Sequence, residues 1–445
     1  MSLKSTTYKC HIYYRIIYHF VAVVESSLEK VTGQVKIFPT ASGRDTSLSE
    51  ILTMLPHFWQ KWPMNRMSSQ RTTLHHNGGL YIHVPFCVRK CAYCAFYSQA
   101  DGLDGGLAEA WLQGIGREGN GVPAGFAPTT VFIGGGTPTA LPEEVFGRML
   151  ALVAERWGGA GILEWTVEAN PGTLTPAKLY LMRESGVTRI SLGAQSFSPD
   201  ALAVLGRIHT PGQIRDAVAM VRDAGIPQLS LDLMYGWPAP TVRAALDAVR
   251  ADLDAALELE PDHISAYCLE IEPGTPLSAR RDAGEAVAAP PTLQRRAYDL
   301  IRRRLTAEGY VHYELSNFAR PGCECRHNLL YWSGGSYIGL GPAAHSHWNG
   351  ERRANSPTLP DWSVDFRETL PPQRKACETL VMGLRRTTGW TRREFLAATG
   401  FDYLALRGPE ITRLADDGLL VNTPGSICLS PASYFTSDAV FAALV

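Results

Sequence analysis

The chain has 445 residues, of which 45% are hydrophobic and 19% charged, so it carries enough apolar material for a sizeable globular core. Glycine (41 residues) and proline (29 residues) stay well below the share that marks low-complexity or collagen-like chains. The net charge of −1, from 42 basic and 43 acidic residues, excludes a protein that wraps nucleic acid by its overall charge.

Residues 1–66 have no sustained hydrophobic period and mix aromatic, basic and hydroxyl side chains. Their most apolar stretch, residues 11–24, is too short to span a bilayer and contains Arg15, so we expect no stable membrane insertion. Two methionines, Met64 and Met67, stand just before the first regular segment. We interpret residues 1–66 as an N-terminal extension that is poorly ordered or precedes the native start. The alternative is an arm that covers the active site.

Six apolar segments of strand length follow, separated by turn residues and by segments with helical periodicity. The expected strands are Leu80–Phe86, Thr130–Ile133, Trp165–Ala169, Ile190–Ala194, Leu229–Met234 and Ile264–Leu269. The expected helices between them are Leu141–Arg156, Pro176–Glu184, Gly212–Asp223 and Val242–Leu259. This alternation indicates a parallel sheet, and six units predict an open, partial (β/α)6 TIM-like barrel with its ligand at the carboxyl ends of the strands.

The remaining residues predict a smaller second unit. A basic amphipathic helix is expected at Leu293–Leu305, and the prolines of residues 357–372 indicate a linker. Helical patterns after residue 376, followed by strand-like residues 418–421 and 426–429, predict helices and a small hairpin. We therefore expect an α/β chain with the barrel at 67–320, a connector and linker at 321–372, and a smaller helical, winged-helix-like α+β domain at 373–445.

Three of the nine cysteines, Cys87, Cys91 and Cys94, fall within eight residues directly after the first expected strand. Such clustering favours metal binding in a reducing compartment over disulfide bonds, and hence a cytoplasmic protein. Three thiolates at this spacing can ligate three irons of a 4Fe-4S cluster and leave the fourth iron for a non-protein ligand. A structural zinc ion would need a fourth ligand, and no obvious one lies nearby. A zinc site and three unrelated thiols are the alternatives.

The cysteine motif resembles the radical S-adenosylmethionine (SAM) superfamily. The resemblance continues one strand–helix unit later at Gly134-Gly135-Gly136-Thr137-Pro138, where the superfamily has a glycine-rich loop for the methionine amino group. Glycines suit that role because they let backbone carbonyls approach a ligand closely. The resemblance implies a partial barrel of the radical SAM type that binds a 4Fe-4S cluster and SAM.

Seven stretches then resemble the coproporphyrinogen dehydrogenase-like family, namely LYIHVPFC, FIGGGTPT, VEANPGTL, ISLGAQSF, GRIHT, LDLMYGWP and HISAY. The resemblance implies SAM contacts at ten positions, which are Tyr81, Tyr93, Gly135, Gly136, Thr137, Glu168, Gln195, Arg207, Asp232 and Ala266. Arg207 can form a fork with the methionine carboxylate. Glu168 and Asp232 can accept hydrogen bonds from ribose hydroxyls or from the ammonium group. The alternative for each position is an ordinary polar residue at a strand end.

Members of this family are of two kinds, an oxygen-independent coproporphyrinogen III dehydrogenase and a heme chaperone. The dehydrogenase carries a further cysteine two residues after the third cluster ligand, whereas this chain has Phe96 there. The stretch His327-Asn328-Leu-Leu-Tyr331-Trp332 resembles the motif proposed for heme binding in the chaperone. An imidazole is a natural axial ligand of heme iron, and aromatic rings can pack on the porphyrin.

The simpler interpretation of that motif is a loop histidine that anchors backbone, with core aromatic residues beside it. Cys323 and Cys325 lie just before the motif and are alternative ligands for a second metal or for heme. His345 and His347 belong to a stretch that matches the family, and a structural loop role explains them better than ligation.

The residues and the resemblance together predict a cytoplasmic heme chaperone that binds a 4Fe-4S cluster, SAM and heme and transfers heme to an acceptor protein. The sequence does not identify that acceptor, and we assign no nucleic-acid partner and no catalytic residue. The alternative is a coproporphyrinogen III dehydrogenase, in which SAM cleavage yields a radical that attacks the porphyrinogen propionates. A third alternative is a radical enzyme with an unrelated substrate, because a fold does not determine a function.

Overall fold

The computed structural model describes residues 77–103 and 106–445, and these residues belong to one compact unit. The predictions for residues 1–66 therefore lie outside the described residues. Within the described ranges, the helices are all too short or too polar to cross a membrane.

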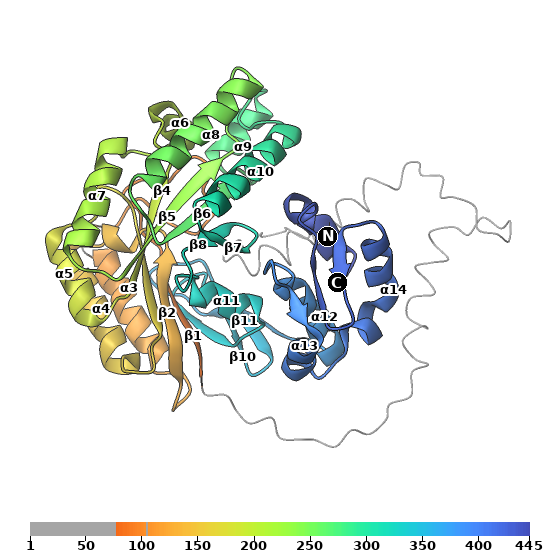
Figure 1. Ribbon diagram of the computed structural model, residues 1–445. Coiled ribbons are helices and arrows are strands. Elements are labelled where there is room, and N and C mark those ends of the chain that lie inside the picture. Colours follow the sequence, from red (N-terminus) through yellow and green to blue (C-terminus); the bar gives the residue numbers. More distant parts are fainter. Residues whose placement is uncertain (1–76, 104–105) are drawn as a thin grey trace, which may run out of the picture. The chain divides into compact units, whose positions relative to one another are not determined.

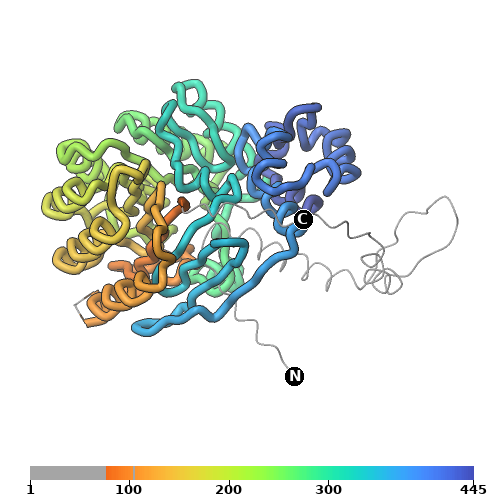
Figure 2. Tube along the Cα trace, turned by 90° about the horizontal axis from the view of Figure 1, so that it is seen from below, coloured from red at the N-terminus to blue at the C-terminus, as the bar shows by residue number. Residues whose placement is uncertain are grey.

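A twelve-stranded sheet with the order β12-β11-β10-β9-β1-β2-β3-β4-β5-β6-β8-β7 organises the fold. Its centre consists of six parallel strands, which are β1 (Asn77–Val84), β2 (Ala127–Gly135), β3 (Glu164–Ala169), β4 (Arg189–Gln195), β5 (Gln228–Tyr235) and β6 (His263–Cys268). These strands coincide with the six expected from the sequence. Figures 1 and 2 show the strand–helix units following one another in chain order around the curved sheet. The predicted parallel centre is confirmed.

Helices cover the outer face of this curved sheet (Figure 1). They are α3 (Gly106–Gly119), α4 (Glu143–Trp157), α5 (Pro176–Ser185), α7 (Pro211–Asp223), α8 (Val242–Leu257) and α10 (Pro291–Ala307). Two short helices, α6 (Pro199–Leu205) and α9 (Pro276–Asp282), instead contact the loop that follows β1. Thr175, Ser198, Thr210 and Thr241 each precede a helix and accept a hydrogen bond from a backbone N–H of its first turn. Such caps satisfy amides that lack a partner within the helix and stabilise it by about 1 kcal/mol each. The predicted helices of this region are confirmed.

Side chains alternate between the two faces of the sheet and thereby separate the core from the site. On β3, Trp165 and Val167 are fully buried against the outer helices and belong to the main hydrophobic core. Glu164, Thr166 and Glu168 take the opposite, inner face, because successive strand residues point to opposite sides. The inner face of the curved sheet is therefore polar, which makes it the place for a ligand.

Short strands extend the sheet at both edges and correct one prediction. Next to β6 lie the antiparallel strands β7 (Val311–Glu314) and β8 (Asn317–Ala319). Next to β1 lie β9 (Tyr337–Leu340), β10 (His345–Trp348), β11 (Glu351–Asn355) and β12 (Val364–Thr369). The interpretation of residues 357–372 as a linker is wrong, because β12 pairs with β11 in this segment. The sheet continues through residues 321–372 instead of ending before them.

The last part of the chain has a hydrophobic cluster of its own, which includes Leu380, Trp390 and Phe395. Its elements are α12 (Pro372–Gly383), α13 (Arg392–Thr399), α14 (Tyr403–Asp416), α15 (Ser437–Ala442) and the strands β13 (Trp390–Thr391), β14 (Leu420–Asn422) and β15 (Ser426–Leu429). The strands form an antiparallel sheet in the order β13-β15-β14. The predicted combination of helices with a small hairpin is confirmed.

A buried ion pair joins the extended sheet to this C-terminal part. Arg352 of β11 is 2.7 Å from Glu378 of α12, measured from Nη1 to Oε2. The guanidinium also contacts Glu368 of β12. Arg352 and Glu378 are both buried, so the pair is shielded from solvent and from salt.

Candidate functional site

The three clustered cysteines lie on a loop that leaves the carboxyl end of β1. The loop is closed at its neck, where the backbone N–H of Cys87 donates to the carbonyl of Gln99 at 2.9 Å. Its middle is held at Ala92, whose N–H donates to the carbonyl of Leu205 at 3.0 Å and whose carbonyl accepts from Leu277 at 2.9 Å. The end of α6 and the start of α9 therefore fix the position of the cysteine loop, which has no regular secondary structure of its own.

Two side chains from other loops direct hydrogen-bond donors at the cysteine sulfurs. The Thr137 hydroxyl donates to Sγ of Cys87 at 3.5 Å, and Nη1 of Arg207 donates to Sγ of Cys91 at 3.3 Å. Burial raises the pKa of the Cys94 thiol to about 12. Burial also raises the pKa of Cys87, and the hydrogen bond from Thr137 partly offsets that rise. Donors so placed stabilise thiolates, which is the form that ligates iron.

The donor set fits an iron–sulfur cluster better than a single metal ion. Among residues 77–103 and 106–445, no three His, Cys, Asp or Glu side chains converge in the manner of a mononuclear metal site. A 4Fe-4S cluster does not need such convergence, because each cysteine ligates a different iron. The three cysteines therefore fit the ligand set of a 4Fe-4S cluster.

The glycine-rich loop after β2 is packed directly against β1. The N–H of Gly136 donates to the carbonyl of Val84 at 2.7 Å. A Cβ atom at Gly136 would lie 2.5 Å from the carbonyl oxygen of Phe86, and one at Gly135 would lie 2.5 Å from the ring of His83. Gly135 also has a φ of +110°, which a side chain would strain. Contacts within the protein thus already require glycine at positions 135 and 136, whether or not a ligand also approaches the loop.

Two half-buried acids face the inner side of the sheet near this loop. Glu168 accepts a hydrogen bond from the N–H of Gly135 at 3.0 Å, and Asp232 accepts from the Ser191 hydroxyl at 3.0 and 3.1 Å. Burial raises the pKa of Glu168 to about 7, and the charge of Asp232 contributes to the rise. Burial raises the pKa of Asp232 as well. Both groups can accept hydrogen bonds from a ligand, and a cationic group between them would relieve their repulsion.

Arg207 occupies the space between the cysteine loop and the sheet. Besides its bond to Cys91, its Nη2 donates to the carbonyl of Gly193 at 2.6 Å and to the side-chain oxygen of Asn170. Gly193 leaves space for the side chains of Asn170 and Arg207 because it has no side chain of its own. A Cβ at this position would lie 2.7 Å from the side-chain oxygen of Asn170. Sequence reasoning missed Asn170, although it lies in the stretch VEANPGTL.

Gln195 ends β4 in a left-handed conformation, with a φ of +64°. Such a backbone is costly for a residue with a side chain, and the surrounding structure must hold it. The next two residues supply that hold, since the Ser196 hydroxyl and the Phe197 N–H both donate to Asp252 of α8 at 2.7 Å. Sequence reasoning also missed Asp252, which is one of three aspartates on an amphipathic helix and is buried.

The other three SAM candidates have different surroundings. Tyr81 is buried on the inner face, where its ring stacks on Phe132 with the centroids 6.2 Å apart. Tyr93 lies on the cysteine loop, and burial raises its pKa. The side chain of Ala266 belongs to the main hydrophobic core, so only its backbone could meet a ligand.

The histidine of the proposed heme motif is enclosed by protein. His327 lies on the short helix α11 (Arg326–Trp332) and is 1% exposed. Its Nδ1 is 2.8 Å from the Thr130 hydroxyl, and its Nε2 is 2.8 Å from the Tyr331 hydroxyl. Burial lowers the pKa of the imidazole to about 3, so the ring is neutral. Both ring nitrogens are engaged, and neither is free to ligate iron in this conformation.

The motif also lies at the opposite end of the strands from the cysteine loop. Thr130 precedes Gly135 by five residues along β2, a separation of about 16 Å at the rise of an extended strand. The cysteine loop and the glycine-rich loop meet at the carboxyl ends of the strands, whereas His327 contacts their amino ends. The structure thus separates the heme candidates from the cluster candidates. Tyr81 is the SAM candidate nearer to them, since the ring of Phe132 lies 6.2 Å from that of Tyr81 and 5.3 Å from that of His327.

Glu164 of β3 holds the beginning of α11. Its carboxylate accepts hydrogen bonds from the N–H groups of Arg326 at 2.8 Å and His327 at 3.0 Å, and from the thiol of Cys325 at 3.4 Å. A carboxylate at this place satisfies amides that have no partner within the helix. Glu164 is a third residue that sequence reasoning missed, because it comes some 160 residues before the helix that it caps.

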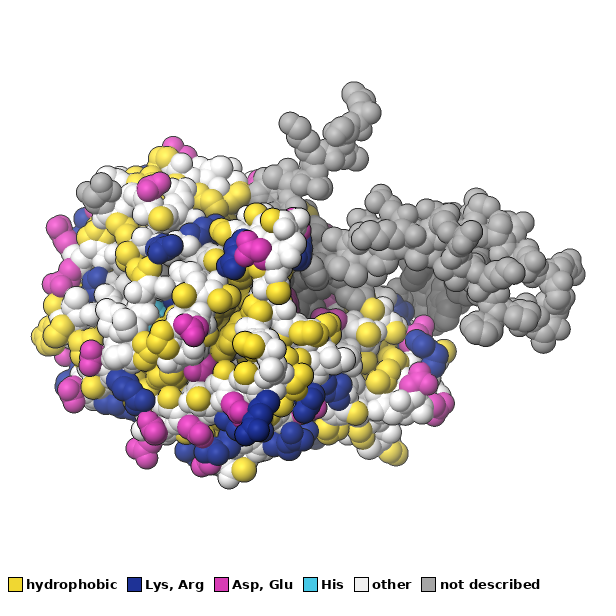
Figure 3. All heavy atoms as spheres, turned by 90° about the horizontal axis from the view of Figure 1, so that it is seen from above, with side chains coloured by type: hydrophobic (Ala, Val, Ile, Leu, Met, Phe, Trp, Pro, Cys, Tyr) yellow, Lys and Arg dark blue, Asp and Glu magenta, His cyan; other side chains and the backbone are white. Residues whose placement is uncertain are grey.

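Most of the remaining heme candidates are buried too, and two are half-buried. Trp332 is buried, with the Arg385 guanidinium 4.5 Å above its ring, while Asn328 is only half-buried. Burial lowers the pKa of His345 and of His347 to about 3. Cys325 is buried and Cys323 half-buried. Figure 3 agrees, since hardly any histidine surface is visible on the face that it shows.

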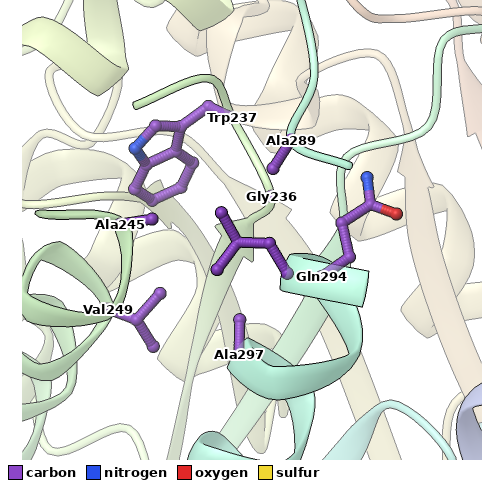
Figure 4. Close-up of a pocket in the computed structure, with 8 residues that line it drawn as sticks. Gly236, Trp237, Ala245, Val249, Ala289, Gln294 and Ala297 are labelled. Atoms are coloured by element: carbon purple, nitrogen blue, oxygen red, sulfur yellow. The ribbon is translucent and has the colours of Figure 1, made fainter. Parts of the chain in front are cut away.

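One small apolar pocket lies apart from these residues, behind the carboxyl end of β5 and between α8 and α10 (Figure 4). It is lined by Gly236, Trp237, Ala245, Val249, Ala289, Leu293, Gln294 and Ala297. None of the cluster, SAM or heme candidates lines it, so it is not part of this site.

Comparison with known proteins identifies the family. Residues 81–250 match the radical SAM superfamily. The heme chaperone HemW of Mycobacterium tuberculosis is 41% identical over 273 residues, which cover 60% of this chain and 69% of the relative. HemW of Bacillus subtilis is 31% identical over 383 residues, which cover 82% of this chain and 98% of the relative. The chain belongs to the HemW family.

A solved structure supports the fold of this HemW-family chain. HemN of Escherichia coli, a coproporphyrinogen III oxidase and radical SAM enzyme, superimposes with a TM-score of 0.71 and covers 94% of this chain and 98% of its own. At 20% identity this likeness concerns the fold alone. The predicted partial barrel of the radical SAM type with a smaller C-terminal part is confirmed.

Proposed function

We propose that this HemW-family chain is a heme chaperone, which binds heme and hands it to an acceptor protein. The observation that carries this proposal is the similarity to the Bacillus subtilis heme chaperone along 98% of that protein. The residue type at position 96 supports it, because the related dehydrogenase has a cysteine there and this chain has an exposed phenylalanine. A cytoplasmic location fits the clustered cysteines, which favour a reducing compartment.

Cys87, Cys91 and Cys94 would hold the 4Fe-4S cluster, and the iron without a cysteine would be available to a non-protein ligand. Around it, Arg207 would direct its guanidinium at the methionine carboxylate. Tyr81, Tyr93, Gly135, Gly136, Thr137, Glu168, Gln195, Asp232 and Ala266 would complete the SAM site. The raised pKa values of the two half-buried acids suit a ligand that brings a positive charge.

For heme we propose His327 as the axial ligand, with Asn328, Tyr331 and Trp332 beside the porphyrin. Because both nitrogens of His327 are hydrogen-bonded, α11 must first move away from β2 and β3. Opening breaks the bond from Nδ1 of His327 to Thr130, at about 1 kcal/mol, whereas Tyr331 lies on α11 itself and keeps its bond to Nε2. In this scheme the described arrangement is a closed state, and heme competes with Thr130 for the imidazole.

The decisive experiment is anaerobic reconstitution followed by a heme titration, a heme-transfer assay and a coproporphyrinogen turnover assay. We expect heme binding and transfer without decarboxylation above background. Formation of protoporphyrinogen by the reconstituted chain would overturn the chaperone proposal in favour of the dehydrogenase. Failure to bind heme at all would remove both the chaperone and the role of His327.

A further inference from the structure

Asn170 lies in the turn after β3, between two side chains that point at different cysteines. Its Nδ2 donates to the Thr137 hydroxyl at 2.6 Å, and its Oδ1 accepts from Nη2 of Arg207. Thr137 in turn contacts the sulfur of Cys87, and Arg207 the sulfur of Cys91. A single amide therefore connects the donors of two of the three candidate cluster ligands.

The directions of these hydrogen bonds are determined by chemistry. A guanidinium only donates, so the atom of Asn170 that faces Arg207 must be the oxygen. The amide nitrogen then faces Thr137, whose oxygen accepts from it. The Thr137 hydrogen is consequently available to the sulfur of Cys87, which accepts. Each group in the series has the role that a negatively charged sulfur requires.

The rest of the structure keeps this amide in place. The backbone carbonyl of Asn170 accepts from the Thr173 hydroxyl at 2.7 Å, and its N–H donates to the same hydroxyl at 3.4 Å. On the other side, Gly193 leaves the space that the Asn170 and Arg207 side chains occupy. The amide is thus fixed from its backbone and given room at its tip.

We propose that Asn170 is a positioning residue for the cluster site, which holds Thr137 and Arg207 against the sulfurs of Cys87 and Cys91. Hydrogen bonds to the sulfurs of an iron–sulfur centre tune its reduction potential, and groups that orient the ligands help to retain the metal. The inference rests on the proposed cluster assignment and does not depend on heme transfer.

The test compares reconstituted wild-type chain with Asn170→Ala and Asn170→Asp. Asn170→Ala releases both donors, so the cluster potential should become more negative and cluster loss to a chelator should accelerate roughly 10- to 100-fold. Asn170→Asp keeps an acceptor for Arg207 but cannot donate to Thr137, and its effect should be intermediate. Iron content, the potential and the EPR spectrum of the reduced cluster are the readouts, and none of them requires turnover.

A matched control and a double mutant separate positioning from general destabilisation. Asn355→Ala removes a side chain that also donates two hydrogen bonds, at 2.7 Å to Glu118 and 2.7 Å to the carbonyl of Gly341. It should leave the cluster potential unchanged. If Asn170 acts partly through Thr137, the effects of Asn170→Ala and Thr137→Val on the potential should be less than additive.

Two results would overturn the inference alone. One is a wild-type cluster whose potential and rate of loss are unchanged in Asn170→Ala, and the other is strict additivity with Thr137→Val. A wild-type chain that takes up no iron would instead remove the cluster assignment, and this inference with it. If circular dichroism shows that Asn170→Ala does not fold, the potential and the rate of cluster loss of Asn170→Asp are compared with wild type instead. Unchanged values in Asn170→Asp would then overturn the inference.

Discussion

Replacing Thr130 by valine tests whether the described arrangement of α11 is a closed state for heme. Thr130 is 2% exposed, and its hydroxyl is 2.8 Å from Nδ1 of His327. Valine has nearly the same shape but no hydroxyl, so Nδ1 loses this partner in the closed state. The open state, in which the imidazole faces heme, loses nothing.

The size of the effect follows from one hydrogen bond. Its removal leaves a buried nitrogen without this partner in the closed state, which costs about 1–2 kcal/mol. The apparent heme affinity is proportional to the fraction of molecules in the open state. While the closed state predominates, every 1.4 kcal/mol by which it is destabilised raises that fraction, and with it the affinity, tenfold. We therefore expect Thr130→Val to bind heme about tenfold more tightly, and to be less stable to urea by a similar free energy.

An anaerobic heme titration followed by the Soret band measures this affinity. Thr166→Val is the matched control, because Thr166 is also a buried inner-face threonine and its hydroxyl has no hydrogen-bond partner in the described part of the chain. His327→Ala should weaken binding and shift the spectrum. Unchanged or weaker heme binding by Thr130→Val would refute the closed-state argument, and unchanged binding by His327→Ala would exclude this ligand.

The remaining predictions concern the cluster loop and the stability of the fold. Cys91→Ala should fail to reconstitute four irons, and an iron content equal to wild type would contradict the cluster assignment. Gly136→Ala places a Cβ 2.5 Å from the backbone oxygen of Phe86, just after β1, so it should also lose the iron–sulfur absorbance. Gly161→Ala, where a Cβ would have nothing within 4 Å, should keep it. Glu378→Gln weakens the buried pair with Arg352 and should cost about 3–5 kcal/mol in urea unfolding, and a cost below 1 kcal/mol would mean that water reaches the pair. Burial raises the pKa of Asp252 from 3.8 to about 6, so the folded state binds this proton more tightly than the unfolded state does. Its contribution to stability is full below pH 4 and is lost as the pH rises to about 6, on the order of 3 kcal/mol, and Asp252→Asn should lack this dependence in unfolding measured from pH 4 to 7.

The sequence by itself determines the features that depend on neighbouring residues. The six central strands were predictable because apolar residues, turn residues and helix caps such as Thr175 and Thr210 act within a few positions. The three cysteines were recognisable for the same reason, since Cys87, Cys91 and Cys94 share one loop. Their spacing predicts metal binding, and the family resemblance favours a 4Fe-4S cluster over the alternatives.

Strand β12 shows where such local information ends. Its residues Val364–Thr369 are alternately half-buried and exposed and are flanked by prolines, which is also the pattern of a linker. What makes the segment a strand is its partner β11, to which it pairs in antiparallel register. Edge strands depend on such pairing more than on their own propensity.

Only the tertiary structure decided what the motif residues contact. His327 could be read from the sequence as a heme ligand or as an anchor, and its partner Thr130 stands 197 positions away. Asn170 gave no signal, because its importance comes from Arg207, which is 37 positions away. Hydrogen bonds between distant segments exist only after the strands have assembled, and no periodicity in the sequence encodes which polar groups then meet.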